Sequence, residues 1–279
     1  MTHHPAIRFA ARTDTGKVRG HNEDALALQE ARRLAVLADG MGGYNAGEVA
    51  SSIATSVFRA CVEQRLQALE ASGRSLSGRT LERLLAESVD SANDEILETS
   101  VSEPEFSGMG TTLVAALFHR NCIVLAHVGD SRVYRFRRGT LVQLTRDHSQ
   151  LQEQIDAGLV SPEWARFAPN KNLITRALGV APQIDVETSH HLVEEGDLYL
   201  LCSDGLSDML SGEELSELLG SDADIETICA DLVFTANNNG GRDNISVILA
   251  RVETFEAQAW PLWAMRLLTW LKSCIDQFR

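Results

Sequence analysis

Short apolar runs of strand length recur along most of the 279-residue chain, and they limit the folds that it can adopt. β-branched or apolar residues fill each run, and Gly, Asp or Asn bounds it, as is typical of strands that end in turns. The expected strands cover 6–11, 24–29, 33–38, 111–118, 121–128, 131–136, 140–144, 184–192, 197–202 and 245–252. Residues 111–144 resemble consecutive hairpins more than βαβ units, so the runs indicate largely antiparallel sheets.

Amphipathic stretches between these runs predict helices at 46–70, 79–99, 147–157, 162–168, 212–219 and 222–236. In the first stretch, apolar residues recur at helical spacing: Val49, Ile53, Val57, Phe58 and Val62. Strands outnumber helices, and no linker, repeat or low-complexity segment separates them. The pattern therefore predicts an α+β protein built in layers.

The composition narrows the possible partners and the compartment. The chain has 39 acidic and 25 basic residues, a formal charge of -14, which repels nucleic acid and anionic membranes unless a local basic patch exists. The five cysteines are scattered and form no C-x-x-C pair. No signal-peptide-like stretch begins the chain, and no window of about 18 uncharged apolar residues occurs. We therefore expect a cytoplasmic protein without a nucleic-acid partner.

Four aspartates stand where a predicted strand meets a turn: Asp39, Asp130, Asp204 and Asp243. A fifth acidic cluster lies at 22–24. Each aspartate taken alone is explained by turn chemistry, because Asp tolerates the left-handed conformation and is common beside Gly. Turns do not require Asp directly against an apolar run each time, whereas a shared site at one end of a sandwich does. The recurrence therefore favours a shared site.

Carboxylates brought together repel, which raises their pKa values unless a cation compensates. The available ligands are all oxygen, and oxygen ligands select Mg²⁺ or Mn²⁺ over zinc. Two such ions that share a carboxylate can hold and deprotonate a water molecule, which then attacks phosphorus. Arg19 lies four residues before Glu23; it could offer a bidentate fork to a phosphate or form a surface salt bridge with Glu23.

Six motifs in order then resemble a known family. They are R-x-x-N-E-D (19–24), D-G-M-G-G (39–43), G-M-G-T-T (108–112), G-D-S-R (129–132), S-D-G-L (203–206) and G-R-D-N (241–244). The chain resembles the metal-dependent serine/threonine protein phosphatases of the type 2C (PPM) family over about residues 6–252, and it is most similar to the compact bacterial members. The resemblance implies a central antiparallel β-sandwich flanked by helices on both faces, in four αββα layers. It also implies a binuclear Mg²⁺ or Mn²⁺ site at one edge.

The resemblance assigns metal ligands residue by residue. Asp39 would bridge the two ions, with Glu23 and the carbonyl of Gly40 completing one site. Asp204 and Asp243 would complete the other. In bacterial members the aspartate of G-D-S-R, here Asp130, joins the Asp204 position in a weaker third site.

The resemblance also assigns catalytic roles. Asp24 would hold a metal-bound water molecule, and Arg19 would bind the substrate phosphate. Family members commonly carry a histidine after D-G-M-G-G, proposed as the general acid for the leaving alkoxide, whereas this chain has Tyr44. A phenol with a pKa of about 10 is protonated at neutral pH but donates less readily than imidazolium. We therefore expect low activity on alkyl phosphates and a smaller penalty for aryl phosphates.

The resemblance divides the chain into a phosphatase domain at 1–253, with a flap at about 146–182 beside the active site, and a tail at 254–279. The tail predicts a short amphipathic helix, with apolar residues at helical spacing: Trp260, Trp263, Leu267, Trp270, Leu271 and Cys274. Three roles stay open for it: docking on its own domain, lying in a membrane surface, or binding a partner.

The expected function is hydrolysis of phosphoserine and phosphothreonine in proteins, by a hydroxide that bridges the two metals, in opposition to a bacterial Ser/Thr kinase. One alternative is a catalytically weak or inactive binding module that keeps the fold. A second is a two-metal phosphodiesterase, which the charge of -14 disfavours. Asp147-His148-Ser149 is interpreted as a helix N-cap and His127 as a core histidine; a place for His127 beside the Asp130 site is the alternative.

Overall fold

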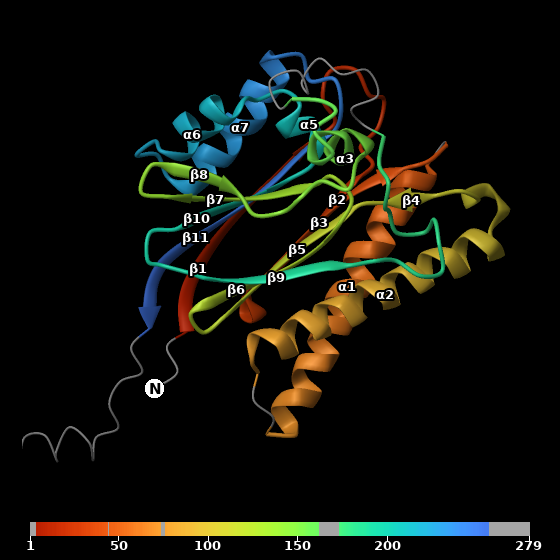
Figure 1. The fold of residues 1–279 in the computed structure, drawn as a ribbon, viewed down its shortest axis with the longest axis horizontal. Helices are drawn as coiled ribbons and strands as arrows, with labels where there is room; N and C mark the ends of the chain where they lie inside the picture. The colour runs from red at the N-terminus through yellow and green to blue at the C-terminus, as the bar shows by residue number, and fades with distance from the viewer. Residues whose placement is uncertain (1–3, 44, 74–75, 162–172, 257–279) are drawn as a thin grey trace, which may run out of the picture.

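The computed structural model describes residues 4–43, 45–73, 76–161 and 173–256, and two antiparallel sheets form its centre (Figure 1). One sheet has the strand order β1-β11-β10-β7-β8, and the other has the order β2-β3-β5-β6-β9, with β4 paired to β3. The strands are β1 (His4–Asp14), β2 (Asp24–Gln29), β3 (Leu34–Met41), β4 (Gly110–Thr111), β5 (Leu113–His119), β6 (Cys122–Val128), β7 (Arg132–Arg137), β8 (Thr140–Gln143), β9 (Glu187–Leu192), β10 (Leu198–Cys202) and β11 (Ile245–Glu256).

The two sheets stack face to face because the residues that each sheet points toward the other are apolar. In β3, Ala35 and Leu37 face the space between the sheets, where they share a core with Tyr199 and Ile248 of the other sheet. The ring of Phe118 meets that of Tyr199 edge to face, with centroids 5.5 Å apart. Both faces of these central strands are therefore buried, which explains their continuous apolar runs.

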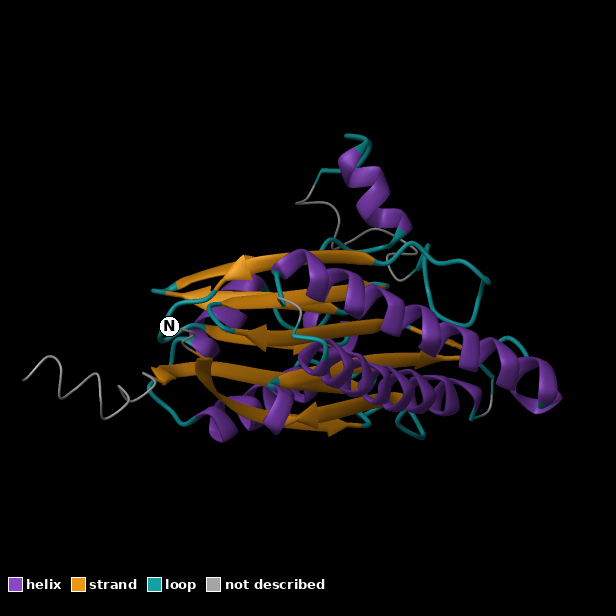
Figure 2. Ribbon diagram, turned by 90° about the horizontal axis from the view of Figure 1, so that it is seen from below, coloured by secondary structure: helices purple, strands orange, loops and turns teal. Residues whose placement is uncertain are grey.

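Helices cover the two outer faces, so the predicted four-layer αββα arrangement is confirmed. The long helices α1 (Ala46–Ala71) and α2 (Gly78–Ser102) pack on the β2-to-β9 sheet, and Figure 2 shows them crossing its strands. The shorter helices α5 (Asp204–Ser207), α6 (Gly212–Leu219) and α7 (Ile225–Asn238) cover the other sheet. Two 3-10 turns, η1 (Glu30–Arg32) and η2 (Pro104–Phe106), complete the described elements.

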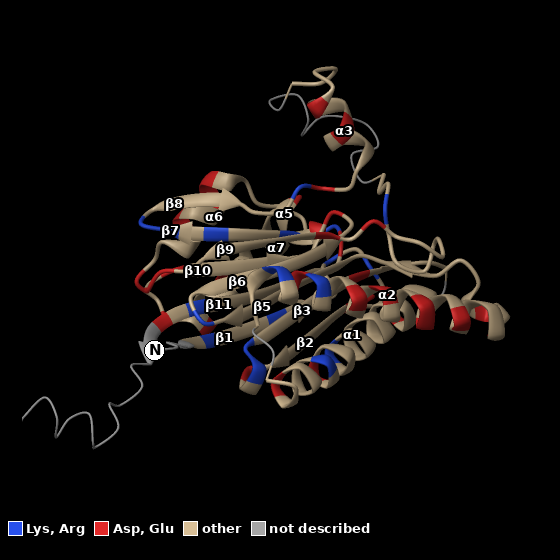
Figure 3. Cartoon of the chain, turned by 60° about the horizontal axis from the view of Figure 1, so that its bottom comes forward, with Lys and Arg blue, Asp and Glu red and all other residues tan. Residues whose placement is uncertain are grey.

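The flap is the segment that departs from the four layers. Its helix α3 (Gln150–Asp156) projects away from the sheets, as Figure 3 shows. An isolated bridge between Thr111 and Leu178 holds the base of the flap to the body, and a second one, between Ser149 and Ile174, joins the two arms of the flap. The helix predicted at 162–168 lies outside the described residues.

All ten predicted strands are present, with three differences. The run at 111–118 is broken at Thr112 into β4 and β5. The expected consecutive hairpins at 111–144 are two hairpins, β5–β6 and β7–β8, because the chain crosses from one sheet to the other between them. β11 continues to Glu256, beyond the predicted domain boundary at 253.

The short helix α5 was not predicted, because four residues carry no helical periodicity. The tail helix was predicted at 254–279; its first three residues belong to β11, and 257–279 lie outside the described residues. Within the described ranges, no helix has the length and apolar character needed to cross a membrane.

Candidate metal centre

The β2-to-β9 sheet brings three of the predicted carboxylates to one edge. Asp24 and Asp39 are paired residues at the adjoining ends of β2 and β3. The amide of Asp39 donates to Oγ1 of Thr112 (3.0 Å), and that hydroxyl also contacts Oγ of Ser131 (2.7 Å). Asp130 precedes Ser131 and is buried. The break between β4 and β5 thus places a threonine hydroxyl that links the Asp39 and Asp130 segments.

The other sheet contributes Asp204 and Asp243 at the same edge. Asp204 is the first residue of α5, directly after β10, and Asp243 lies just before β11. Because β10 and β11 are antiparallel neighbours, the end of one lies beside the start of the other. The two loops touch closely at Gly205, where a Cβ would lie 2.0 Å from the carbonyl oxygen of Asn244. Only glycine fits this approach.

Asn244 joins the two sheets at the centre. Its Oδ1 accepts from the amide of Glu23 (2.8 Å), which immediately precedes β2. The carbonyl of Glu23 in turn accepts from the amide of Gly40 (3.1 Å) and from Oγ of Ser51 (2.6 Å). A Cβ on Gly40 would lie 2.1 Å from the carbonyl oxygen of Gly47 in α1. These contacts hold Glu23 and Gly40 beside the aspartates.

The carboxylates lie close enough to raise one another's pKa values. Burial raises the pKa of Asp39 well above its ordinary value, and the charges of Asp24, Asp204, Asp130 and Asp243 raise it further. Burial and the neighbouring Asp130 do the same for the pKa of Asp204. Burial also raises the pKa values of Asp24 and Asp130 to about 6. Without a cation, the protein therefore disfavours ionisation of these acids, whereas a bound cation would stabilise their charged forms.

Unpartnered oxygens show that the donor set fits hard divalent ions. Oε1 of Glu23 and Oδ1 of Asp24 are buried and have no hydrogen-bond partner. A buried carboxylate oxygen without a partner is costly, and a cation removes that cost. The surrounding donors are carboxylate and carbonyl oxygens, the ligands preferred by Mg²⁺ and Mn²⁺. The residues present fit the ions that the sequence predicted.

Arg19 lies at the rim of the cluster, about half exposed. Its Nη2 donates to Oδ2 of Asp243 at 2.7 Å, whereas the sequence suggested Glu23 as an ion-pair partner. Asp24 is held by Oγ of Ser203, which donates to its Oδ2 at 2.9 Å. Tyr44 lies outside the described residues, so its role stays a prediction.

A cavity of about 460 Å³ adjoins the cluster and shares Asp130 and Asp204 with it. Its walls come from α3 of the flap on one side and from α5 and the start of α6 on the other. Apolar side chains such as Leu151 and Met209 line it together with Asp208. Sequence reasoning missed these lining residues; their only signal was their place within the flap or directly after S-D-G-L.

The site also includes contacts around the Asp147-His148-Ser149 segment. Ser149 is the N-cap of α3 as predicted, and its side chain accepts from the amide of Gln152. Asp147, two residues before the cap, forms an ion pair with Arg132 at 2.6 Å. His148 is buried against His127, and both lie near Glu187. Two stacked sheets covered by helices, with a cluster of carboxylates suited to hard divalent ions at one edge, are the features of a metal-dependent phosphatase.

Comparisons with known proteins agree with this class. The family model of protein phosphatase 2C matches residues 17–249. The serine/threonine phosphatase stp of Listeria monocytogenes is 38% identical over 241 residues, which cover 85% of this chain and 93% of that protein.

Solved structures extend the likeness to the fold. The crystal structure of the serine/threonine phosphatase Stp1 from Staphylococcus aureus has a TM-score of 0.82 and 33% identity, and the match covers 91% of this chain and 98% of that one. The crystal structure of the catalytic domain of the serine/threonine protein phosphatase PstP has a TM-score of 0.75 and 38% identity, and the match covers 89% of this chain and 99% of that one. That structure holds two manganese ions. The chain therefore belongs to the protein phosphatase 2C family and is an enzyme of that family.

Proposed function

We propose that the protein hydrolyses phosphoserine and phosphothreonine in other proteins with the help of two Mn²⁺ or Mg²⁺ ions. The observation that carries this proposal is the convergence of carboxylates from both sheets, with buried oxygens of Glu23 and Asp24 left without hydrogen-bond partners. The two manganese ions in the related PstP structure support it. The proposed domain at 1–253 includes the whole region that matches the family model.

The ligand assignment follows the resemblance to the family, and the packing of the cluster supports it. We assign Asp39, whose pKa is raised by burial and by four neighbouring aspartates, to both ions. Glu23 and the carbonyl of Gly40 would hold one ion; the other ligands are Asp204 and Asp243, with Asp130 and Asp204 at a weaker third site. When bound, the ions offset the carboxylate charge, hold phosphate oxygens and lower the pKa of water so that it can act as a nucleophile.

Three side chains would act on the substrate and the solvent. Arg19 projects at the rim with its guanidinium fixed by Asp243, so it can present its remaining N–H groups to a phosphate. Asp24 has Oδ2 fixed by Ser203, which leaves Oδ1 to accept a hydrogen bond from a water molecule. Tyr44 would donate the proton that the leaving alkoxide needs. An unchanged ratio of alkyl to aryl phosphate turnover in Tyr44→His would exclude that role.

The decisive experiment is release of phosphate from a phosphothreonine peptide with and without Mn²⁺. We expect manganese-dependent release that Asp39→Asn and Asp204→Asn abolish. Bis-p-nitrophenyl phosphate, tested beside the monoester, measures diesterase activity. A wild-type protein that binds Mn²⁺ but leaves the phosphopeptide intact, or that prefers the diester, contradicts the proposal.

The proposed setting is a cytoplasmic signalling pathway in which a Ser/Thr kinase phosphorylates the same substrates. The tail at 257–279 is proposed to contact its own domain, a membrane surface or a partner. Deleting the tail and measuring liposome flotation separates these roles. Flotation that the deletion leaves unchanged excludes the membrane role.

A further inference from the structure

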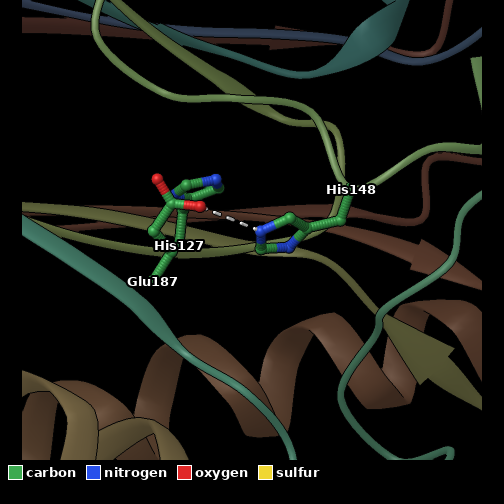
Figure 4. A group of neighbouring side chains, drawn as sticks. All are labelled: His127, His148 and Glu187. Atoms are coloured by element: carbon green, nitrogen blue, oxygen red, sulfur yellow. Dashed lines mark hydrogen bonds and ion pairs between the residues drawn. The ribbon is translucent and has the colours of Figure 1, made fainter. Parts of the chain in front are cut away.

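His127, His148 and Glu187 lie together beneath the base of the flap (Figure 4). Their ligand-capable atoms lie within 4.8 Å of one another, but their hydrogen bonds do not suit an ion. Nδ1 of His148 accepts from the amide of Gly129 at 3.1 Å, so in the neutral ring Nε2 carries the proton. That nitrogen faces Glu187 at 3.4 Å, and Nη1 of Arg176 lies 3.4 Å from it. These three side chains are therefore held by hydrogen bonds and are not arranged as a metal site.

His148 is bonded to Gly129 in both directions. Besides the bond to its ring, its own amide donates to the carbonyl of Gly129 at 2.9 Å. The ring is buried and stacks on that of His127, with centroids 4.6 Å apart and an interplanar angle of 17°. Nε2 of His127 lies 2.9 Å from the carbonyl oxygen of Arg146, so this histidine also binds the flap base. The position of His148 is thus set from three sides.

Asp147 makes the second connection. Its carboxylate receives Nε and Nη2 of Arg132 in a bidentate pair, with distances of 2.9 and 2.6 Å. Nη1 of the same arginine donates to the hydroxyl of Tyr134. Asp147 is buried, and such a paired, fork-shaped contact fixes orientation as well as distance. Two consecutive flap residues therefore bind the two ends of the segment 129–132.

The segment 129–132 is also held from the opposite side. Oγ of Ser131 contacts Oγ1 of Thr112, the hydroxyl that accepts from the amide of Asp39. Gly129 has φ +107°, and a Cβ there would lie 2.6 Å from Cγ2 of Thr112. The chain passes between the sheets at this point, and Asp130 lies between the two anchors.

We propose that Asp147 and His148 are positioning residues: they fasten the flap base to segment 129–132 and hold Asp130 where it completes the weaker metal site. We call residues 129–132 and 146–148 together the flap clasp. The inference rests on the proposed function, because that function makes Asp130 a metal ligand. It implies that loosening the clasp lowers the affinity of that site and leaves the sites built on Glu23, Asp39 and Asp243 intact.

Paired substitutions at His148 test the clasp in the full chain. His148→Asn places an acceptor near the position of Nδ1, whereas His148→Gln places its amide near Nε2 and leaves the Gly129 amide without an acceptor. His148→Ala removes both groups. The readouts are hydrogen exchange of the Gly129 amide, calorimetric titration with Mn²⁺ and turnover of p-nitrophenyl phosphate. His190→Asn is the matched control, since that histidine lies on β9 and pairs with Glu82.

We expect the Gln and Ala variants to exchange the Gly129 amide about tenfold faster or more, because a buried amide has lost its acceptor. Their weakest Mn²⁺ affinity should fall about tenfold while the tighter sites keep theirs. The His148→Asn and His190→Asn variants should stay within about twofold of the wild type. If His148→Ala does not fold, Asp147→Asn, which weakens the pair with Arg132, takes its place in the titration with Mn²⁺, and His148→Gln alone tests the exchange of the Gly129 amide.

Unchanged Gly129 exchange or unchanged weak-site affinity in the Gln variant would overturn the proposal. An equal loss at all metal sites would also overturn it, since the effect would then be a general loss of structure. If the wild type binds Mn²⁺ with this pattern but hydrolyses neither p-nitrophenyl phosphate nor phosphopeptide, the proposed function fails while the clasp stands.

Discussion

Replacing Asp24 with asparagine should stabilise the metal-free protein at neutral pH. Burial raises the pKa of Asp24 from 3.8 to about 6. A carboxyl with a raised pKa is harder to ionise in the folded than in the unfolded chain, so the free energy of unfolding falls as pH rises from about 4 to about 6. It stays lower at higher pH. A shift of about two units corresponds to about 3 kcal/mol.

Asparagine cannot ionise, and its Oδ1 can still accept from Ser203. Asp24→Asn should therefore gain up to about 3 kcal/mol over the wild type at pH 7.5 in EDTA, and almost nothing at pH 4. For a chain of this size that gain raises the melting temperature by about 6–12 °C. Thermal unfolding of both proteins at the two pH values measures it.

Manganese should reverse the order of the two proteins, since bound cations remove the penalty that the wild-type carboxylate carries. The wild type should then melt at a temperature at least as high as Asp24→Asn, which has one carboxylate fewer to offset the charge of the ions. Equal melting temperatures in EDTA at pH 7.5 would refute the reasoning. So would a difference that persists unchanged at pH 4, because it would not come from ionisation.

Three further substitutions separate the site from the scaffold. Arg19→Ala removes a half-exposed ion pair, so the free energy of unfolding measured in urea should change by less than about 1 kcal/mol. The kcat/KM on a phosphopeptide should fall at least about tenfold. Unchanged KM and kcat would show that Arg19 does not touch the phosphate. Arg137→Met leaves the fully buried Asp197, at the end of β10 away from the metal site, without its ion-pair partner. The free energy of unfolding should fall by about 3–5 kcal/mol, while kcat at saturating Mn²⁺ stays unchanged. A loss of activity in the folded variant would show that this ion pair also supports the site. Gly205→Ala should abolish manganese binding in calorimetry, since the new Cβ would lie 2.0 Å from a backbone carbonyl oxygen of the loop before β11. Gly212→Ala is the control: its Cβ would have no atom within 4 Å, so this variant should bind manganese as the wild type does.

The fold was predictable because its strands and helices satisfy local rules. The helix at 212–219 has the same bounds in prediction and structure, and Ser211 and Glu214 form the capping box that begins it. The strand break at Thr112 was not predictable, since it comes from a bond between its hydroxyl and the distant Asp39 amide. Likewise, the crossing between sheets at 129–131 carries the same turn residues as an ordinary hairpin.

At the candidate site too, the sequence predicted which residues gather but not which contacts they make. Repeated aspartates at strand ends predicted which acids gather, because antiparallel neighbours bring strand ends together. The partners of acidic residues were not predictable: Arg19 pairs with Asp243, 224 residues away in the sequence, and Asp147 pairs with Arg132.

The fold also explains why the predicted ligands lie near strand ends and in the loops beyond them, and not at strand centres. A carboxylate at the centre of β3 or β10 would lie between two apolar layers, where its charge could not be compensated. At the edge, backbone turns let acids from both sheets face one space, and Asn244 ties the sheets together there. The cost is a cluster with raised pKa values, so binding affinity depends on how firmly each loop is held. Asp39 is held by β2, β4 and Thr112, whereas Asp130 depends on a crossing loop and on the flap. Differences in metal affinity among the sites should therefore follow differences in loop anchoring, even though every ligand is an oxygen.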